Sequence, residues 1–324
     1  MFDERSGWGY TDKSVLITTD GGAHWEDVTP GRVRDSKSSF SAFFIDANIG
    51  WVFTEFDEPN LIPFRTLDGG RTWELFVTPF YHAYLDFVDP ENGWALEASD
   101  CGAGSCGGFL YRTTDGGETW EQIHAIDPYA EDGQNTIPFG GIKESITFSD
   151  TKHGWITGSY ALSGFVYLYN TKDGGVTWQH QDIPRSPDTE KNFLVLDPPQ
   201  FFTVQEGVLP VVFHFDKPVL VLYMTRDGGA TWEETTGMEK SDARTIYDCA
   251  SLQDCWFVDG ETLLVSHDGA QTWTPITPNI KMDDFWKLEF VNSRTGWALS
   301  WKESGIEPLY RTDDGGLTWN PITP

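Results

Sequence analysis

Basic residues are scarce in this chain. Its 324 residues include 22 lysines and arginines against 50 aspartates and glutamates, which gives a formal net charge of −28. Nucleic acids and anionic membranes bind proteins through basic surfaces. The sequence therefore excludes nucleic acid as the main partner, and its acidic surface favours solubility.

Long apolar runs and metal-ligand spacings are absent as well. No run of 18 apolar residues occurs, so the sequence predicts no transmembrane segment. The four cysteines form no Cys-x-x-Cys and the seven histidines form no His-x-x-x-His. We therefore expect no zinc site, no other resident metal and no cofactor. One alternative stays open, a structural cation beside the acidic pairs Asp283-Asp284 and Glu131-Asp132.

The few cysteines come as two close pairs, from which we expect the disulfides Cys101–Cys106 and Cys249–Cys255. Free buried thiols are the alternative. Local disulfides in a chain with no other cysteine indicate an oxidising compartment. We therefore predict an extracytoplasmic location: periplasmic, secreted, or anchored by a segment absent from this sequence, because Met1 falls almost directly on the first repeat.

One short turn is abundant, and its clearest copy reads Thr66-Leu67-Asp68-Gly69-Gly70-Arg71-Thr72-Trp73. Seven copies follow one another at intervals of 48, 47, 58, 54, 41 and 46 residues. The aspartate accepts backbone hydrogen bonds, the glycines allow positive φ, and the tryptophan opens the next strand. His24 replaces the threonine of the first copy, and Ala270 the second glycine of the sixth. The seven aspartates, to which we assign a structural role, are Asp20, Asp68, Asp115, Asp173, Asp227, Asp268 and Asp314.

A second element, a strand–turn–strand unit such as Phe44…Gly50-Trp51, precedes each of these turns. Its other copies are Phe2…Gly7-Trp8, Phe87…Gly93-Trp94, Phe148…Gly154-Trp155, Phe202…Gly207-Val208, Cys249…Cys255-Trp256 and Phe290…Gly296-Trp297. Four antiparallel strands per unit, repeated seven times, predict an all-β fold, a seven-bladed β-propeller. The single domain spans 1–324, with blades at approximately 1–30, 31–78, 79–125, 126–183, 184–236, 237–277 and 278–324.

The strand order also separates two faces. With strands A to D counted from the axis outward, the A–B turns and the C–D turns share one face. The B–C loops and the blade-to-blade connections share the other, where the long segments 54–63, 98–108, 126–141 and 181–191 lie. We predict binding on this variable face. We also expect the seven C–D turn tryptophans to be nearly buried, and the ring to close without a strand exchanged between its ends.

The turn string resembles the Asp-box, or BNR repeat. The compound unit resembles the photosystem II stability/assembly factor-like group of BNR propellers over essentially the whole chain. That resemblance implies a non-enzymatic, extracytoplasmic scaffold that binds a protein partner during assembly of a larger complex, and we expect a monomer. The photosynthetic members present an arginine-rich patch. This sequence shows no comparable cluster, because Arg32 and Arg34 are close together but basic residues are few overall.

Asp-boxes also occur in sialidases and other glycoside hydrolases, which leaves a glycan as an alternative ligand and hydrolysis as an alternative function. A sialidase needs three arginines, a tyrosine nucleophile paired to a glutamate, and an acid. A similar set of residues to a sialidase motif occurs here, but in a different order: Leu61-Ile62-Pro63-Phe64-Arg65. Xyloglucan-type glucanases build their catalytic cleft from two paired propellers, which a single propeller cannot do. With 50 acidic residues, a catalytic carboxylate pair stays open as an alternative, although no residue is singled out as catalytic.

Of 15 tryptophans, 13 belong to the repeats, and Trp286 and Trp301 do not. Both fall in the seventh unit, at strand ends that point to the variable face near the axis. Aromatic side chains beside charges suit a peptide or a sugar ring. Tyr81, His82 and Arg244, at the starts of other inner strands, are the expected neighbours. The alternative is that Trp286 plugs the axis and Trp301 covers a loop.

Overall fold

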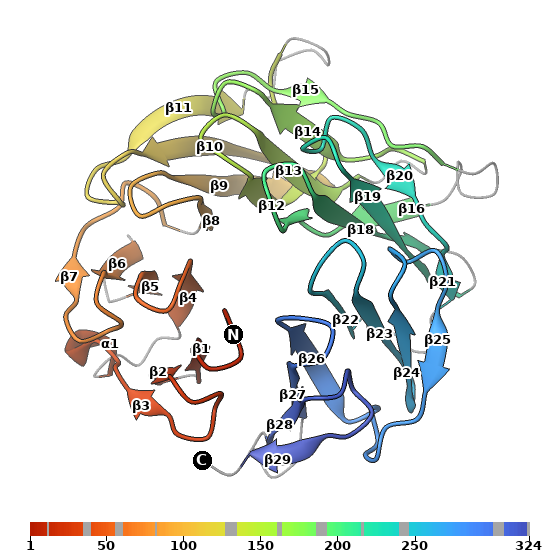
Figure 1. Cartoon of the computed structure of the whole chain (residues 1–324). Coiled ribbons are helices and arrows are strands. Elements are labelled where there is room, and N and C mark those ends of the chain that lie inside the picture. The colour runs from red at the N-terminus through yellow and green to blue at the C-terminus, as the bar shows by residue number, and fades with distance from the viewer. Residues whose placement is uncertain are drawn as a thin grey trace.

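Seven antiparallel blades stand around a common axis in a ring, and the fourth and fifth of them are joined in one sheet (Figure 1). The computed structural model describes residues 1–11, 13–34, 40–55, 61–81, 83–126, 135–160, 164–185, 193–214, 217–239, 246–300 and 308–322. The predicted all-β, seven-bladed fold is confirmed. We number the blades one to seven along the chain.

Strands are given from the inner to the outer strand of each blade. The first blade has β1 (Gly7–Tyr10), β2 (Val15–Thr18) and β3 (Glu26–Asp27), and the second has β4 (Phe40–Phe44), β5 (Gly50–Glu55), β6 (Leu61–Thr66) and β7 (Glu74–Leu75). The third blade has β8 (Tyr84–Phe87), β9 (Gly93–Gly102), β10 (Ser105–Thr113) and β11 (Glu121–Ile126), and the fourth has β12 (Ile142–Phe148), β13 (Gly154–Ser159), β14 (Leu168–Thr171) and β15 (Gln179–His180). The strands of the last three blades are β16 (Phe193–Leu196), β17 (Gln200–Phe201), β18 (Gly207–His214), β19 (Val219–Thr225), β20 (Glu233–Glu234) and β21 (Met238–Glu239); β22 (Ile246–Cys249), β23 (Cys255–Asp259), β24 (Thr262–Ser266) and β25 (Thr274–Ile276); β26 (Phe285–Phe290), β27 (Gly296–Ser300), β28 (Leu309–Thr312) and β29 (Asn320–Ile322).

The first blade has three strands where four were expected, because residues 1–4 form no strand. It nevertheless completes the ring, and among the described strands none is exchanged between the first and seventh blades, as predicted. The side chain of Trp297 donates to the carbonyl of Gly21 (2.9 Å), and that of Arg311 to the carbonyl of Glu4 (3.0 Å). The ring therefore closes by packing and hydrogen bonds between blades.

The fifth blade has a divided inner strand and a divided outer strand. Both β16 and β17 pair with β18, and Pro198 and Pro199 lie between them, where a proline has no N–H to donate to a sheet. Both β20 and β21 pair with β19 on the other side. A bridge between Ser159 and Val195 also joins β16 to the fourth blade.

The turns of the two repeated elements share one face, as the strand order predicts. In every blade, a glycine N–H of the C–D turn donates to a carbonyl of the A–B turn, at 2.7–3.1 Å. The seven pairs are Gly21–Arg5, Gly69–Asn48, Gly116–Glu91, Gly174–Lys152, Gly228–Gln205, Gly269–Gln253 and Gly315–Arg294. We call this uniform surface the turn face, and the opposite surface the loop face.

Neighbouring blades meet through a stacked pair of rings. At five of the boundaries the tryptophan of strand B lies against the phenylalanine that ends the inner strand of the next blade, stacked in four of them and tilted in the fifth, Trp155–Phe201; Trp94 and Phe148, for example, have ring centroids 3.6 Å apart. The other pairs are Trp8–Phe44, Trp51–Phe87, Trp155–Phe201 and Trp256–Phe290. Hydrophobic clusters span these boundaries in the same way, so the core lies between the blades.

Each such phenylalanine also covers the glycine six residues later. A Cβ on Gly93 would lie 2.4 Å from the ring of Phe87, so this position requires glycine. The same geometry corrects two assignments made from the sequence. In the fifth blade the ring over Gly207 is Phe201 rather than Phe202, and in the first blade Met1 rather than Phe2 lies over Gly7.

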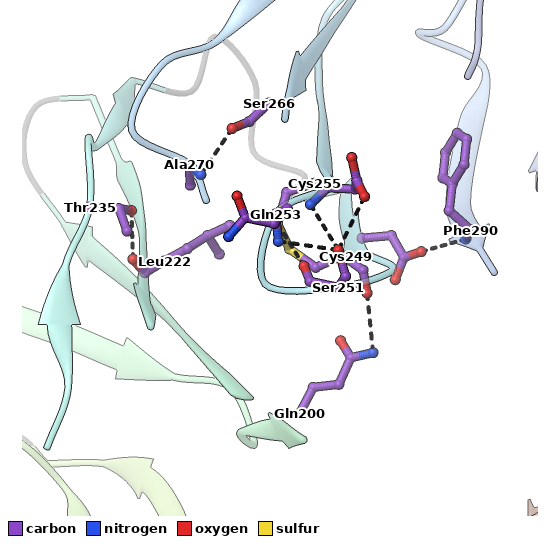
Figure 2. Close-up of a disulfide and its surroundings, with 12 residues drawn as sticks. Gln200, Leu222, Thr235, Cys249, Ser251, Gln253, Cys255, Ser266, Ala270 and Phe290 are labelled. Atoms are coloured by element: carbon purple, nitrogen blue, oxygen red, sulfur yellow. Dashed lines mark hydrogen bonds between the residues drawn. A yellow bond between two sulfur atoms is a disulfide. The ribbon is translucent and has the colours of Figure 1, made fainter. Parts of the chain in front are cut away.

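Both predicted disulfides are present. Cys249 and Cys255 pair directly across the two strands, in the register that other blades use for phenylalanine and glycine (Figure 2). The disulfide therefore takes the place of the ring-over-glycine contact. Trp256, which follows Cys255, is retained, fully buried and stacked on Phe290.

The inner strands are also linked by carboxyl groups. The Asp86 carboxylate accepts a hydrogen bond from the N–H of Phe148 in the next blade (2.6 Å), and Asp248 accepts one from the N–H of Phe290. Desolvation is the largest cause that raises the pKa of each carboxyl to about 7, whereas the backbone hydrogen bonds lower it. Glu289 forms the corresponding contact with the terminal amino group of Met1.

Burial of the seven C–D turn tryptophans is only partly as predicted. Trp178, Trp232 and Trp319 are buried. The other four, which are half-buried, are Trp25, Trp73, Trp120 and Trp273. The buried ones share their clusters with residues that precede an inner strand, as Trp178 does with Ile137 and Trp319 with Met282. The prediction was wrong for the other four; Trp120, for example, is half-buried although it packs against the fully buried Phe80.

Helical structure is confined, within the described part of the chain, to α1 (Gly31–Arg34). No helix there is long and apolar enough to cross a membrane.

Candidate functional site

The aspartates of the turn face are fully used in holding their own turns. Asp68 accepts the N–H of Thr72 at 2.9 Å and its hydroxyl at 2.6 Å, and these bonds lower the pKa of Asp68. In the first copy, Nδ1 of His24 lies 2.7 Å from Oδ2 of Asp20 and replaces the missing hydroxyl. The hydrogen bond to His24 is the largest cause that lowers the pKa of Asp20 to about 2. These carboxylates act as structural acceptors.

The loop face carries two of the five residues proposed from the sequence for binding. Tyr81 is 47% exposed and Trp286 is 45% exposed, whereas most aromatic side chains of the described residues are buried or half-buried. Trp286 is therefore available at the surface. The other three, His82, Arg244 and Trp301, lie outside the described residues.

A β-bulge displays Trp286. The register between β26 and β27 shifts after Phe285, so that Trp286 is an extra residue between the pairs Phe285–Ser300 and Lys287–Leu299. A bulge redirects the side chain at the extra position. Phe285 itself is buried and packs against Tyr310 and Trp319, with centroids 5.4 and 6.2 Å away.

Tyr81 is displayed in a similar way, at the entrance to β8. The preceding residue, Phe80, is fully buried and packs against Tyr111 and Trp120, with centroids 5.3 and 5.1 Å away. Glu97 is also buried, and its carboxylate accepts the N–H of Tyr81 (3.2 Å) and the hydroxyl of Tyr111 (3.4 Å). The backbone of Tyr81 is thus fixed while its ring remains exposed.

The two exposed rings therefore follow buried phenylalanines that contact equivalent partners, a strand C tyrosine and the C–D turn tryptophan of their own blade. Both lie at the loop-face ends of inner strands, in the third and seventh blades, separated around the ring by the first and second blades (Figure 1). The sequence analysis missed the anchors Phe80 and Phe285. The signal was a pair of adjacent aromatic residues, just before inner strand β8 and at the start of inner strand β26.

Two further apolar side chains are exposed at the same ends of inner strands. Tyr84 begins β8 and is 43% exposed, and Ile142 begins β12 and is 39% exposed. Neither was selected from the sequence, because a tyrosine or an isoleucine at the start of a strand fits the ordinary strand pattern. Together with Tyr81 and Trp286 they place exposed apolar or aromatic side chains at the loop-face ends of inner strands in the third, fourth and seventh blades.

The segment 98–108, expected to be a long loop, is a stiff hairpin. Strands β9 and β10 continue to a two-residue turn in which Ala103 and Gly104 both have positive φ (51° and 81°). The Cys101–Cys106 disulfide joins the two strands close to this turn. The expectation failed because the glycine-rich sequence reads as a loop although it also permits tight strand pairing.

Lys143 holds this hairpin against the fourth blade. Its side chain is buried, and its ammonium donates to the carbonyls of Cys106 (2.7 Å), Phe139 (2.9 Å) and Gly141 (3.0 Å). Burial lowers the pKa of Lys143 to about 7. The lysine is thus used internally, and its charge is not presented on the loop face.

The residues considered for a cation give no assembled site in the described part of the chain. No group of three or more His, Cys, Asp or Glu side chains converges there. Asp283 and Asp284 lie within that part, whereas Glu131 and Asp132 lie outside it.

Comparison with known proteins agrees with the resemblance predicted from the repeats. A family model described as photosynthesis system II assembly factor YCF48 matches residues 133–242, and the BNR/Asp-box repeat model matches residues 111–122. The predicted resemblance to this assembly-factor group of BNR propellers is confirmed. None of the curated protein sequences matches this chain.

Among solved structures, one described as YCF48 bound to D1 peptide matches with a TM-score of 0.59 and 22% identity, over 96% of this chain and 91% of that one. This likeness shows a shared fold. A GH74 enzyme from Niastella koreensis matches with a TM-score of 0.38 and 14% identity, over 95% of this chain and 51% of that one. The GH93 α-L-arabinofuranosidase of Fusarium graminearum gives 0.44 and 11%, over 84% and 90%.

Proposed function

We propose that this protein is a non-enzymatic interaction scaffold that binds a protein partner through its loop face. The observation that carries the proposal is the contrast between the two faces. On the turn face, every A–B and C–D turn bonds to the other by the same contact. The loop face instead displays Tyr81 and Trp286, each held by a buried phenylalanine. Binding sites on rigid scaffolds lie where the connections vary.

The family match and the shared fold support a protein as the partner. In the YCF48 structure the bound molecule is a peptide, and large rings at an exposed site are typical of protein recognition. We propose an extracytoplasmic location for the interaction, because both cysteine pairs are disulfide-bonded.

The test of this function compares binding with hydrolysis. The double variant Trp286→Ala, Trp301→Ala should remain folded, since Trp286 is nearly half exposed, and should lose its protein partner. Wild-type protein should release no sugar from sialosides, β-glucans or arabinans. Partner binding by the folded double variant would place the site elsewhere. Release of sugar that is abolished by substituting a loop-face carboxylate would establish a glycosidase instead.

A further inference from the structure

We propose that Tyr81 and Trp286 form a two-point aromatic grip whose occupant is an extended, basic segment of a partner protein. The proposal rests on the proposed function and specifies the class of partner for the same face. It follows from three observations: how the two rings are held, where they lie around the axis, and which charges accompany them.

The rings are positioned before any partner arrives. Trp286 is an extra residue of a bulge whose neighbour Phe285 is buried, and Tyr81 follows the buried Phe80. The N–H of Tyr81 is fixed by Glu97. Ordering of the chain normally costs free energy on binding, and the backbone that carries these two rings is already fixed.

Their placement on two separate blades selects an extended occupant. The inner strands β8 and β26 belong to the third and seventh blades, with the first and second blades between them. A single side chain cannot reach both rings from such a position. An extended chain advances about 3.3 Å per residue, so one segment laid across the loop-face end of the axis can contact both.

Charge selects a basic occupant. Asp283 and Asp284 precede Trp286 directly, and the chain carries a net charge of −28. The lysines on either side are held by acids, Lys281 by Glu261 (3.2 Å) and Lys287 by Glu289 (3.9 Å). An exposed ring that follows two acidic residues, as Trp286 does, attracts arginine and lysine side chains through both cation–π contact and charge and repels acidic segments, and the exposed Tyr81 ring offers a second cation–π contact.

The test selects short random peptides, displayed on phage, on the intact wild-type protein. The selected peptides are then synthesised and their affinities measured for wild type, for Tyr81→Ala/Trp286→Ala, and for Tyr81→Phe/Trp286→Phe. A matched control is Leu67→Ala/Leu317→Ala, two turn-face side chains that are 51% and 49% exposed. Thermal unfolding of each variant verifies that it is folded.

We expect peptides rich in arginine or lysine, with affinity that falls about tenfold or more in the alanine pair. The phenylalanine pair and the turn-face control should bind as wild type does, and higher salt should weaken binding. Acidic or uncharged peptides that still need Tyr81 and Trp286 would overturn the basic class and leave the loop-face function standing. If none of the selected peptides needs Tyr81 and Trp286 for binding, the proposed aromatic grip is wrong. Dependence on Leu67 and Leu317 would contradict the loop-face function as well.

Discussion

Val208 and Cys249 belong to the same buried cluster at the boundary between the fifth and sixth blades. At five other boundaries the corresponding residues are a tryptophan and a phenylalanine with stacked or tilted rings. The two departures from the repeat therefore meet at one boundary. The smaller Val208 is matched by a smaller partner, and the disulfide from Cys249 to Cys255 supplies the local constraint that the phenylalanine ring supplies elsewhere.

Removal of this disulfide should destabilise the ring measurably. Cys249→Ser/Cys255→Ser should lower the free energy of unfolding by about 2–3 kcal/mol, because the crosslink closes a short loop and both residues are buried. The triple variant Val208→Trp/Cys249→Phe/Cys255→Gly, which restores the repeat, should recover part of the loss. Urea denaturation measures both, and equal stability of the serine variant and wild type would contradict this role.

Tryptophans of the two repeated elements should differ in their contribution to stability. Trp94→Ala should cost about 3–5 kcal/mol, because Trp94 is buried, stacks on Phe148 and donates to the carbonyl of Gly174. Trp25→Ala should cost clearly less, since Trp25 is only half-buried. Urea denaturation of the two variants provides the comparison. Equal losses in the free energy of unfolding would contradict the conclusion that the core lies between the blades.

The carboxyl groups that link inner strands should make the folded protein less stable as pH rises from about 4 to 7. The folded pKa of Asp86 and of Asp248 is raised to about 7 from 3.8, so the folded state binds more protons than the unfolded state within that window. Each group can lower stability by up to about 1.4 kcal/mol per pH unit. Asp86→Asn/Asp248→Asn keeps an acceptor for the N–H groups of Phe148 and Phe290 and should flatten the profile. An unchanged slope in this variant would assign the dependence to other groups.

Much of the fold could be predicted from the sequence because local turn chemistry repeats seven times. The position of Asp68 relative to Thr66, Gly70 and Thr72 determines the turn, and the same spacing recurs in every blade. The disulfides followed from cysteine spacing alone. The two faces followed from strand order, which needs no knowledge of side-chain packing.

The misassigned features depend on contacts between distant segments. Met1 over Gly7 and Phe201 over Gly207 differ by one residue from the predicted partners, because sequence letters do not fix the register. The partial burial of Trp25 and Trp73 depends on how other segments pack around each ring, which the repeated turn does not determine. At the candidate site the sequence singled out Tyr81 and Trp286; the aromatic residues that precede them, Phe80 and Phe285, were visible in the sequence, but their burial and partners depend on the three-dimensional packing.

The most direct test of the account is site-specific photo-crosslinking in the native host cells. A photoreactive amino acid is placed at Trp286 on the loop face and, in a separate variant, at Leu317 on the turn face, two positions of similar exposure, 45% and 49%. We predict a discrete protein adduct from position 286 and none from position 317. An adduct from position 317 alone, or equal adducts from both, would contradict a loop-face interaction scaffold.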